Sequence, residues 1–211
     1  MKTNIDLTGL VNKYLRILKL DTSAILSSLM MHIVCYVKKI RISSGNRFFG
    51  LCYMYRKMNT SITIGKNNTF RSTAYSNLIG INHKCIIATH FHNASITIGN
   101  NCGFSGTTVG AKESIKIGNN VLCGANTVIT DFDWHAIDPL TRKTGEPQSS
   151  PVVIEDNVWI GMNSLILKGV TIGKNSVIGA GSVVAKSIPE NVIAAGNPCK
   201  VIKPLFNNGS K

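Results

Sequence analysis

The residue best suited to acid–base chemistry in this chain is His135, which lies in a segment of polar and aromatic residues. Asp131 precedes it by four positions and Asp133 by two, so either carboxylate is close enough in sequence to orient or polarise the imidazole. Trp134 supplies an apolar wall, and residues 136–150 follow as a loop. A histidine with a candidate orienting carboxylate favours general-base catalysis. A polar loop histidine held by hydrogen bonds is the alternative.

The remaining histidines and motifs give weaker signals. His83, His90 and His92 could hold a metal ion, but no carboxylate or cysteine ligand accompanies them, so we expect polar surface and no metal. The sequence has no nucleophile elbow, dinucleotide fingerprint or phosphate-binding loop. A serine nucleophile and nucleotide hydrolysis therefore lack support.

The elements that must position these residues follow a six-residue repeat. From residue 154 every sixth residue is aliphatic, namely Ile154, Ile160, Ile166, Ile172, Ile178 and Val184. A period of six fits neither a helix nor a simple strand, and it indicates a repeat architecture. An aliphatic–x–aliphatic–Gly signature recurs near multiples of 18 residues, so three hexads make one unit. Such a unit is typical of one coil of a triangular parallel β-helix, with coils stacked ~4.8 Å apart. We expect about seven coils.

The longest interruption of the repeat contains His135. Between Thr130 and Pro151 no aliphatic residue keeps the six-residue period. Solenoids tolerate insertions as loops on one face, and functional residues are frequent in such loops. We therefore predict a β-helix domain over residues 59–205, a functional loop at 131–151 and a C-terminal tail at 206–211.

Residues 1–58 differ from the repeat and form a predicted helical and capping segment. Apolar residues at helical spacing predict two helices, at 7–20 and 22–38, with Asp21 and Thr22 as caps of the second. A strand-like stretch with several aromatic residues follows and should cap the repeat.

The charge of the chain is concentrated near its beginning. Residues 1–60 hold ten lysines and arginines against two aspartates, so they carry +8 of the formal net charge of +13. A basic surface serves solubility, or it favours anionic partners such as phosphates, acidic saccharides or a membrane surface. No nucleic-acid-binding motif is present, so we expect no nucleic-acid partner.

The same segment leaves a peripheral membrane contact open. The longest uncharged stretch, residues 22–37, is shorter than the ~20 residues needed to span a bilayer, so we expect it to pack on the main domain. Lys38 and Lys39 directly after it suit a membrane surface. The six cysteines lack CxxC spacing and predict reduced thiols, hence a cytoplasmic protein that could work at the inner face of the membrane.

The repeat and its interruption together resemble the hexapeptide-repeat acyltransferases, whose fold is a left-handed β-helix. The resemblance spans about residues 60–205. It rests on residues 117–121, 130–135, 157–161, 177–184 and 193–198. Within this family the chain is similar to the galactoside and maltose O-acetyltransferases and to enzymes that acetylate bacterial surface polysaccharides.

This resemblance implies a homotrimer with active sites between subunits, acetyl-CoA as donor, a saccharide as acceptor and no metal. His135 matches the general base, and Met162 matches a position whose backbone N–H stabilises the oxyanion. The residues that match positions along the coenzyme are Trp159, Ala180, Lys186, Lys200 and Lys203.

The acceptor side departs from the family pattern. The galactoside enzymes have an Asn-Phe-Asn contact where this chain has Phe104-Ser105-Gly106. We take Ser105 as the substitute and Asn126 and Arg142 as further acceptor-binding candidates. The long helical N-terminal segment fits a larger or lipid-linked acceptor.

We therefore predict an acetyl-CoA-dependent O-acetyltransferase that acts on a saccharide of a surface polysaccharide, such as a capsule, O-antigen or exopolysaccharide unit. Three alternatives remain at this point: an N-acetyltransferase acting on an amino sugar, a metal enzyme of the γ-carbonic anhydrase type, and a non-catalytic scaffold.

Overall fold

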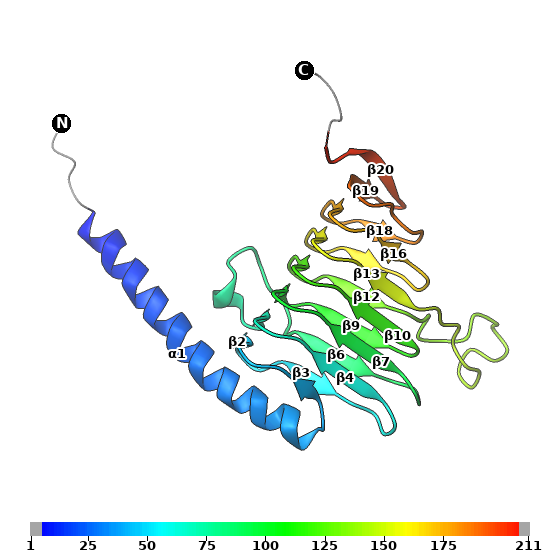
Figure 1. Cartoon of the computed structure of the whole chain (residues 1–211), viewed down its shortest axis with the longest axis horizontal. Helices are drawn as coiled ribbons and strands as arrows, with labels where there is room; N and C mark the ends of the chain where they lie inside the picture. The colour runs from blue at the N-terminus through cyan, green and yellow to red at the C-terminus, as the bar shows by residue number, and fades with distance from the viewer. Residues whose placement is uncertain (1–5, 207–211) are drawn as a thin grey trace.

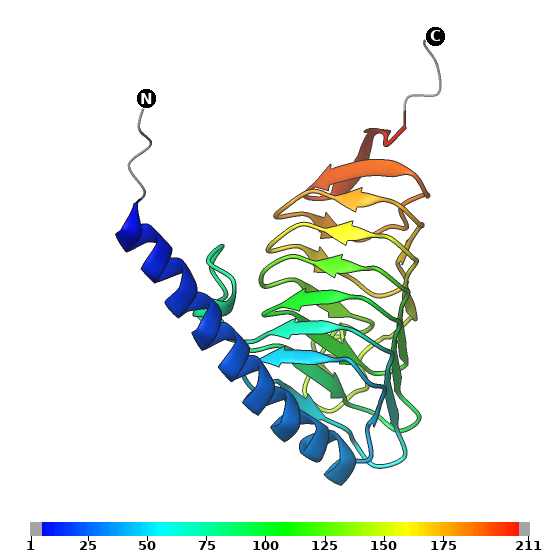
Figure 2. The ribbon, with the colours of Figure 1, turned by 60° about the vertical axis from the view of Figure 1, so that its left-hand side comes forward.

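The computed structural model describes residues 6–206 and consists of one long helix followed by three β-sheets (Figure 1). The helix is α1 (Leu7–Val37). As far as β18 each sheet takes every third strand, so the chain passes through the sheets in turn and returns one strand further along (Figure 2). This winding is that of a parallel β-helix, as the six-residue repeat predicts. The last two strands, β19 and β20, both join sheet B, and they pair in antiparallel orientation.

The three sheets, here named A, B and C, have the following strands. Sheet A contains β1 (Arg41–Ile42), β4 (Ser61–Ile64), β7 (Ser95–Ile98), β10 (Ser114–Ile117), β13 (Val152–Ile154) and β16 (Thr171–Ile172). Sheet B contains β2 (Arg47–Phe49), β5 (Thr69–Arg71), β8 (Gly103–Ser105), β11 (Leu122–Cys123), β14 (Trp159–Ile160), β17 (Val177–Ile178), β19 (Val192–Gly196) and β20 (Cys199–Pro204). Sheet C contains β3 (Tyr53–Tyr55), β6 (Ile86–Thr89), β9 (Thr108–Ala111), β12 (Val128–Thr130), β15 (Leu165–Ile166) and β18 (Val183–Val184). A short 3-10 helix, η1 (Ala74–Ser76), lies between β5 and β6.

Equivalent residues of successive rounds stack inside the prism. In sheet A one ladder joins Ile64, Ile98, Ile117, Ile154 and Ile172, all of which are buried. The parallel register puts equivalent side chains one strand spacing apart, so each hexad buries its aliphatic residue against the same residue of the next round.

Sheet B has an aromatic ladder at its lower end. The rings of Phe48, Phe70 and Phe104 stack with centroids 4.8 and 5.0 Å apart. These rings fill the first rounds of the prism beside sheet B, and Cys123, Ile160 and Ile178 fill the later rounds.

Asparagines at the corners allow the chain to turn between sheets. Asn120, Asn157, Asn175 and Asn191 all have φ between 55° and 61°, in the left-handed region that asparagine tolerates. Their side chains hydrogen-bond one another in sequence order, at 3.1, 3.1 and 2.7 Å. The asparagines at this corner thus form a second ladder, in which the side-chain amides are hydrogen-bonded to one another.

Two predictions for the N-terminal segment are wrong. The predicted helices 7–20 and 22–38 form one continuous helix, because the Thr22 hydroxyl donates to the carbonyl of Leu18 at 2.8 Å and does not cap a new helix. The sheets also begin before the predicted boundary at residue 59, because β1, β2 and β3 already pair in parallel with β4, β5 and β6.

Two loops leave the prism. The predicted loop at 131–151 connects β12 to β13. A second loop, residues 72–85, connects β5 to β6 and was not predicted, because no hexad anchor of regular period frames it. Of the predicted tail at 206–211, all but the first residue lie outside the described residues.

Helix α1 packs on the solenoid through one face of its second half. Ala24, Ser27, Met31 and Cys35 are its buried residues, and β2 is the strand they cover. The Ser27 hydroxyl also accepts the N–H of Gly50 at 3.2 Å. By length and composition alone α1 could cross a membrane, which the 16-residue uncharged stretch did not suggest.

Candidate functional site

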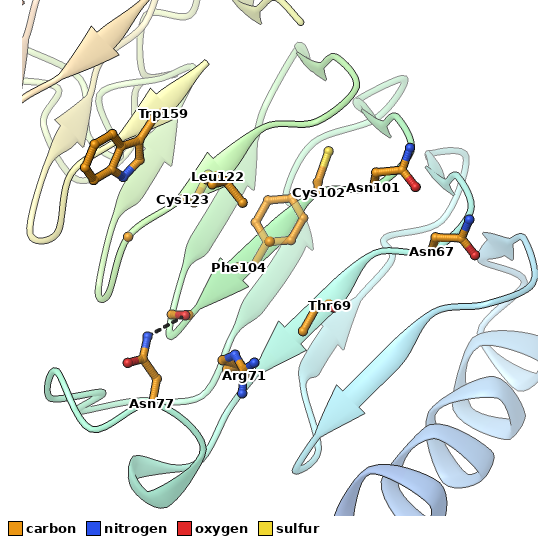
Figure 3. A pocket seen from close by; sticks show the side chains of 13 residues that line it. Asn67, Thr69, Arg71, Asn77, Asn101, Cys102, Phe104, Leu122, Cys123 and Trp159 are labelled. Atoms are coloured by element: carbon orange, nitrogen blue, oxygen red, sulfur yellow. Dashed lines mark hydrogen bonds between the residues drawn. The ribbon is translucent and has the colours of Figure 1, made fainter. Parts of the chain in front are cut away.

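A polar pocket of about 390 Å³ lies on the outer face of sheet B, over β5, β8, β11 and β14 (Figure 3). Arg71, Asn77, Ser105, Leu122 and Trp159 are among its lining residues. We call it the sheet B pocket. Its floor is built by alternation along the strands, which turns Phe70 and Phe104 inward and the neighbouring residues outward.

Two groups in this pocket pair across its lower edge. The Asn77 side-chain amide donates to the Ser105 hydroxyl at 3.1 Å (Figure 3). Ser105 therefore lines this pocket, and its role in acceptor binding stays a prediction. Asn77 and the loop that carries it were missed, because a partner on an inserted loop leaves no mark in the repeat pattern.

Arg71 is the second residue that the sequence did not single out. Its guanidinium donates to the carbonyl of Ser76 at 2.7 Å and lies 4.6 Å from the centre of the Phe49 ring. Burial lowers the pKa of Arg71, and the charges of Arg47 and Arg16 lower it further. A cation surrounded by other cations gains from an anionic partner, so this edge of the pocket favours an acidic ligand group.

One outer column of sheet B connects the pocket to the basic end of the solenoid. The register places Leu122, Trp159, Val177, Ile193 and Lys203 opposite one another on successive strands. Trp159 is exposed, as its predicted role along the coenzyme requires. Along this column the sheet B pocket is followed by the apolar residues Trp159, Val177 and Ile193, and then by the cation Lys203.

A register shift brings the second lysine to the same side. Lys200 and Lys203 would project to opposite faces of a regular strand, because they are three residues apart. The irregularity between Ile193 and Ala194 pairs Lys203 with Ile193 and Lys200 with Ala195, two residues of one face. Both lysines therefore extend from the outer side, while Lys186 is exposed in the turn after β18.

Two backbone amides, at the corners after β14 and β17, have no hydrogen-bond acceptor in the described residues. Within residues 6–206 the N–H groups of Met162 and Ala180 donate to no acceptor. The two residues occupy equivalent positions in successive rounds, since Ile160 pairs with Ile178. A free amide is what the predicted oxyanion role of Met162 needs.

The loop at 131–151 folds back on sheet C and exposes His135. Trp134, with φ of +66°, lays its ring 4.8 Å from His90 and 4.6 Å from Phe132, centre to centre. Gly110 allows this approach, since a Cβ there would lie 3.2 Å from the indole. A second pocket of about 300 Å³ lies beside these rings. The next residue, His135, is thereby held at the edge of an aromatic wall.

The two aspartates proposed to orient His135 have other partners. The Asp131 carboxylate is buried and accepts the N–H groups of Lys112 and Glu113 at 2.6 and 2.8 Å. Burial raises the pKa of Asp131, and these amides oppose that effect. Asp133 pairs with Lys168 at 2.5 Å. The part of the chain that is described shows no hydrogen bond from either aspartate to His135.

The predicted site residues are not all brought together in one chain. Ser105 and Trp159 line the sheet B pocket, whereas His135 lies on the loop between sheets C and A and does not line that pocket. Arg142, on the same loop as His135, donates to the carbonyl of Ile137 at 3.0 Å.

Asn126 has structural contacts, and its predicted role in acceptor binding stays a prediction. Its side chain donates to the carbonyl of Gly80 at 2.9 Å and accepts the N–H of Asn82 at 3.1 Å. It therefore fastens the loop of residues 72–85 to the solenoid.

His90 and His83 have structural partners. His90 packs in the aromatic wall, and burial, with a smaller effect of Lys57, lowers its pKa. The His83 ring hydrogen-bonds the carbonyl of Lys84 at 2.9 Å. No group of three or more histidine, cysteine or acidic side chains that could hold a metal occurs among residues 6–206. The metal-enzyme alternative thus lacks a ligand set in this part of the chain.

The parallel β-helix with hexad ladders, together with the exposed loop histidine and the basic end, can be compared with known protein families. The model of the bacterial transferase hexapeptide (six repeats) matches residues 151–186. Residues 151–186 are therefore similar to the repeat of the hexapeptide transferase family.

Individual relatives are also similar to the chain. The galactoside O-acetyltransferase of Escherichia coli (strain K12) is 50% identical over 92 residues, which cover 44% of this chain and 45% of that protein. The enzyme of the same name from Lactococcus lactis subsp. lactis (strain IL1403) is 47% identical over 97 residues, 46% of each chain. The chain thus spans about half the length of these curated relatives. A solved galactoside acetyltransferase in complex with coenzyme A is 30% identical, covers 79% of this chain and 66% of that one, and has a TM-score of 0.50.

Proposed function

We propose that the protein is an acetyl-CoA-dependent O-acetyltransferase that acts on a saccharide hydroxyl. The observation that carries the proposal is the outer column of sheet B, which joins a polar, sugar-sized pocket to a pair of lysines over an apolar strip. Coenzyme A has the same order of parts: a reactive thioester, a largely uncharged arm and a phosphorylated nucleotide. Relatives named galactoside O-acetyltransferase and the structure with bound coenzyme A support this assignment.

The donor would lie along this column. Trp159 would cover the uncharged arm, and Lys200 and Lys203, with Lys186 nearby, would meet the phosphates. The N–H of Ala180 is free for an amide of the arm, and that of Met162 for the thioester oxygen. Binding of the donor by these backbone amides and lysines would require no metal.

The complete site would lie between two copies of the chain. His135 and the sheet B pocket occupy different sides of one prism, so a second copy must bring its loop to the first copy's pocket. We propose a homotrimer of left-handed β-helices, the assembly and hand that the family resemblance implies. The three sheets form six rounds with a strand in each sheet, followed by β19, where about seven coils were expected.

In this site His135 would act as the general base. Its imidazole takes the proton of a sugar hydroxyl while that oxygen attacks the thioester carbonyl, and the N–H of Met162 donates to the oxygen that becomes negative. When the C–S bond breaks, the imidazolium returns the proton to the leaving thiolate. The exposed position of His135 leaves its ring accessible to a substrate.

We propose an acceptor from a surface polysaccharide that carries an acidic group. Ser105 and Asn77 offer hydrogen bonds to hydroxyls, and the cationic surroundings of Arg71 favour a carboxylate or phosphate on the sugar. The six cysteines are unpaired and buried, which suits a reducing cytoplasm. An N-acetyltransferase on an amino sugar would use the same base and donor, and is the second candidate.

The test is acetyl transfer by the purified protein from acetyl-CoA to saccharide acceptors, with thiol release and product mass as readouts. His135→Ala should lower the rate ~10²–10⁴-fold. His92→Ala, at an exposed histidine outside both pockets, is the matched control and should keep the rate. Full activity of His135→Ala would refute the mechanism. An amine acetylated in preference to a hydroxyl would select the second candidate.

A further inference from the structure

One face of α1 is apolar along its whole length and is not covered by any described element. Two sets of apolar residues on this face have a spacing of eleven positions: Leu7, Leu18 and Leu29 form the first set, and Tyr14, Ile25 and Tyr36 form the second. We call these six residues the outer stripe. Eleven residues are close to three helical turns, so both sets stay on one side of the helix. Each of these side chains is at least 62% exposed. A stripe this continuous is an interaction surface, because scattered apolar residues do not keep such a period.

The outer stripe is directed away from the solenoid. The opposite face of the second half of α1, with Ala24, Ser27, Met31 and Cys35, is the one buried against the body. The first half of the helix diverges from the sheets, as Figure 2 shows. The solenoid of the same chain therefore cannot cover the stripe without losing these contacts.

Basic residues accompany the stripe. Lys13, Arg16 and Lys19 lie on the helix outside the stripe, and Lys38 and Lys39 follow its end. All five are exposed, and three of them also have a contact within the chain: Arg16 donates to the carbonyl of Tyr75 at 3.4 Å, Lys19 lies over the Tyr75 ring, and Lys38 donates to the carbonyl of Met54 at 2.6 Å.

Acidic counterparts are few along this segment. Residues 6–60 contain Asp6 and Asp21, and Asp21 is paired with Arg47 at 3.1 Å. A second copy of a chain with net charge +13 would bring cations to cations. An anionic lipid surface complements both the apolar stripe and its basic surroundings.

The helix is better suited to lie along a bilayer than to cross it. From Ala24 to Cys35 the helix is buried against the solenoid, and Arg16 and Lys19 contact Tyr75 of the loop 72–85, so residues 7–19 are the longest part that could enter a bilayer. At 1.5 Å per residue they extend ~20 Å, less than the ~30 Å of a hydrocarbon core. They also include Lys13, Arg16 and Lys19, which can extend to headgroups from a helix at the interface.

We propose that α1 docks the protein on an anionic bilayer, with the outer stripe in the interfacial layer and the flanking lysines and arginines at the headgroups. The helix packs on β2, and the sheet B pocket begins on the adjacent β5 (Figure 3). Docking therefore holds this pocket near the membrane surface. If the proposed function is right, the acceptor is a saccharide presented there, such as one linked to a lipid.

The experiment is co-sedimentation of the full chain with vesicles of phosphatidylcholine mixed with phosphatidylglycerol, and with vesicles of phosphatidylcholine alone. The native protein should bind the mixed vesicles, and the binding should weaken with added salt. The double variant Leu18→Gln, Leu29→Gln should bind at least about tenfold more weakly. The control Met58→Gln, Leu140→Gln changes two exposed residues outside α1 and should bind as the native protein does.

A charge variant separates the two contributions. Lys13→Gln, Lys19→Gln should lower binding to the mixed vesicles and leave the weak binding to phosphatidylcholine unchanged. No binding of the native protein to mixed vesicles would overturn the proposal. It would also be overturned if the Leu18, Leu29 variant kept its vesicle binding and changed the oligomer mass by light scattering, since the stripe would then be buried between copies. Acetyl transfer to a soluble saccharide should not change in this variant, so the proposed function is tested separately.

Discussion

Substitution of Asp131 by Asn separates a structural carboxylate from a catalytic one. In the sequence Asp131 is as good a partner for His135 as Asp133 is, since both are a few residues away. In the structure its two oxygens accept the N–H groups of Lys112 and Glu113, at 2.6 and 2.8 Å, with no exposure to solvent. The carboxylate thus fixes the turn between β9 and β10, and we expect its loss to affect stability and not chemistry.

The magnitude follows from these two hydrogen bonds. Each bond to an ionised acceptor contributes ~1.5–3 kcal/mol. Asn keeps one acceptor oxygen, but its NH₂ group cannot accept the second amide, so one partly buried N–H loses its partner at a cost of ~1–3 kcal/mol. We expect Asp131→Asn to lower the free energy of unfolding by about 2–4 kcal/mol. For a chain of 211 residues this corresponds to a drop in Tm of roughly 5–15 °C.

The assay combines thermal unfolding with steady-state kinetics at pH 7.5 and a temperature well below both transitions. We expect the lower Tm, with kcat within about twofold of the native value. Asp138→Asn, at an exposed aspartate of the same loop, is the control and should change neither quantity appreciably. The opposite pattern, an unchanged Tm with a fall in kcat of tenfold or more, would show that Asp131 acts through His135 and would refute the reasoning.

Three further outcomes are expected. Phe70→Leu removes the middle ring of the aromatic stack and should lower the free energy of unfolding by about 2 kcal/mol in a denaturant titration, and an unchanged midpoint would contradict the ladder's role. Because burial holds the pKa of His90 below its ordinary 6.5, the folded protein binds fewer protons than the unfolded chain just below that pH. Stability should therefore be lost as pH falls through this window. In measurements of Tm against pH, His90→Asn should make the fall in Tm smaller. His92→Asn, at an exposed histidine, should leave the fall in Tm as it is in the native protein. Replacing Lys200 and Lys203 together by Gln should raise the KM for acetyl-CoA about tenfold or more with little change in kcat, and an unchanged KM would exclude them from the donor site.

The local pattern of the sequence was sufficient for the architecture. A six-residue period with an aliphatic residue at each anchor allows one way to bury those residues, the inward ladders of which Ile154 and Ile172 are members. The position of the functional loop followed as well, since residues 131–151 are where the period is interrupted. Trp159 and His135 were identified by their matching positions in the family pattern, and Ser105 as the substitute where the chain departs from it. The structure places Ser105 and Trp159 in one pocket.

The partners of each polar side chain could not be read from the sequence, because they come from rounds far along the chain. Asp131 meets amides at residues 112 and 113, and Asn126 meets the loop of residues 72–85. The lysines of β20 share a face because of a register shift, which strand alternation cannot anticipate.

Composition and hydrophobic period, then, determined a triangular solenoid with an interrupted turn, because burial of aliphatic residues depends on spacing alone. Only the tertiary structure decided which carboxylates are engaged in hydrogen bonds and which amides are free. It also decided that α1 is one helix with an uncovered apolar face, because packing on β2 uses only one side of it.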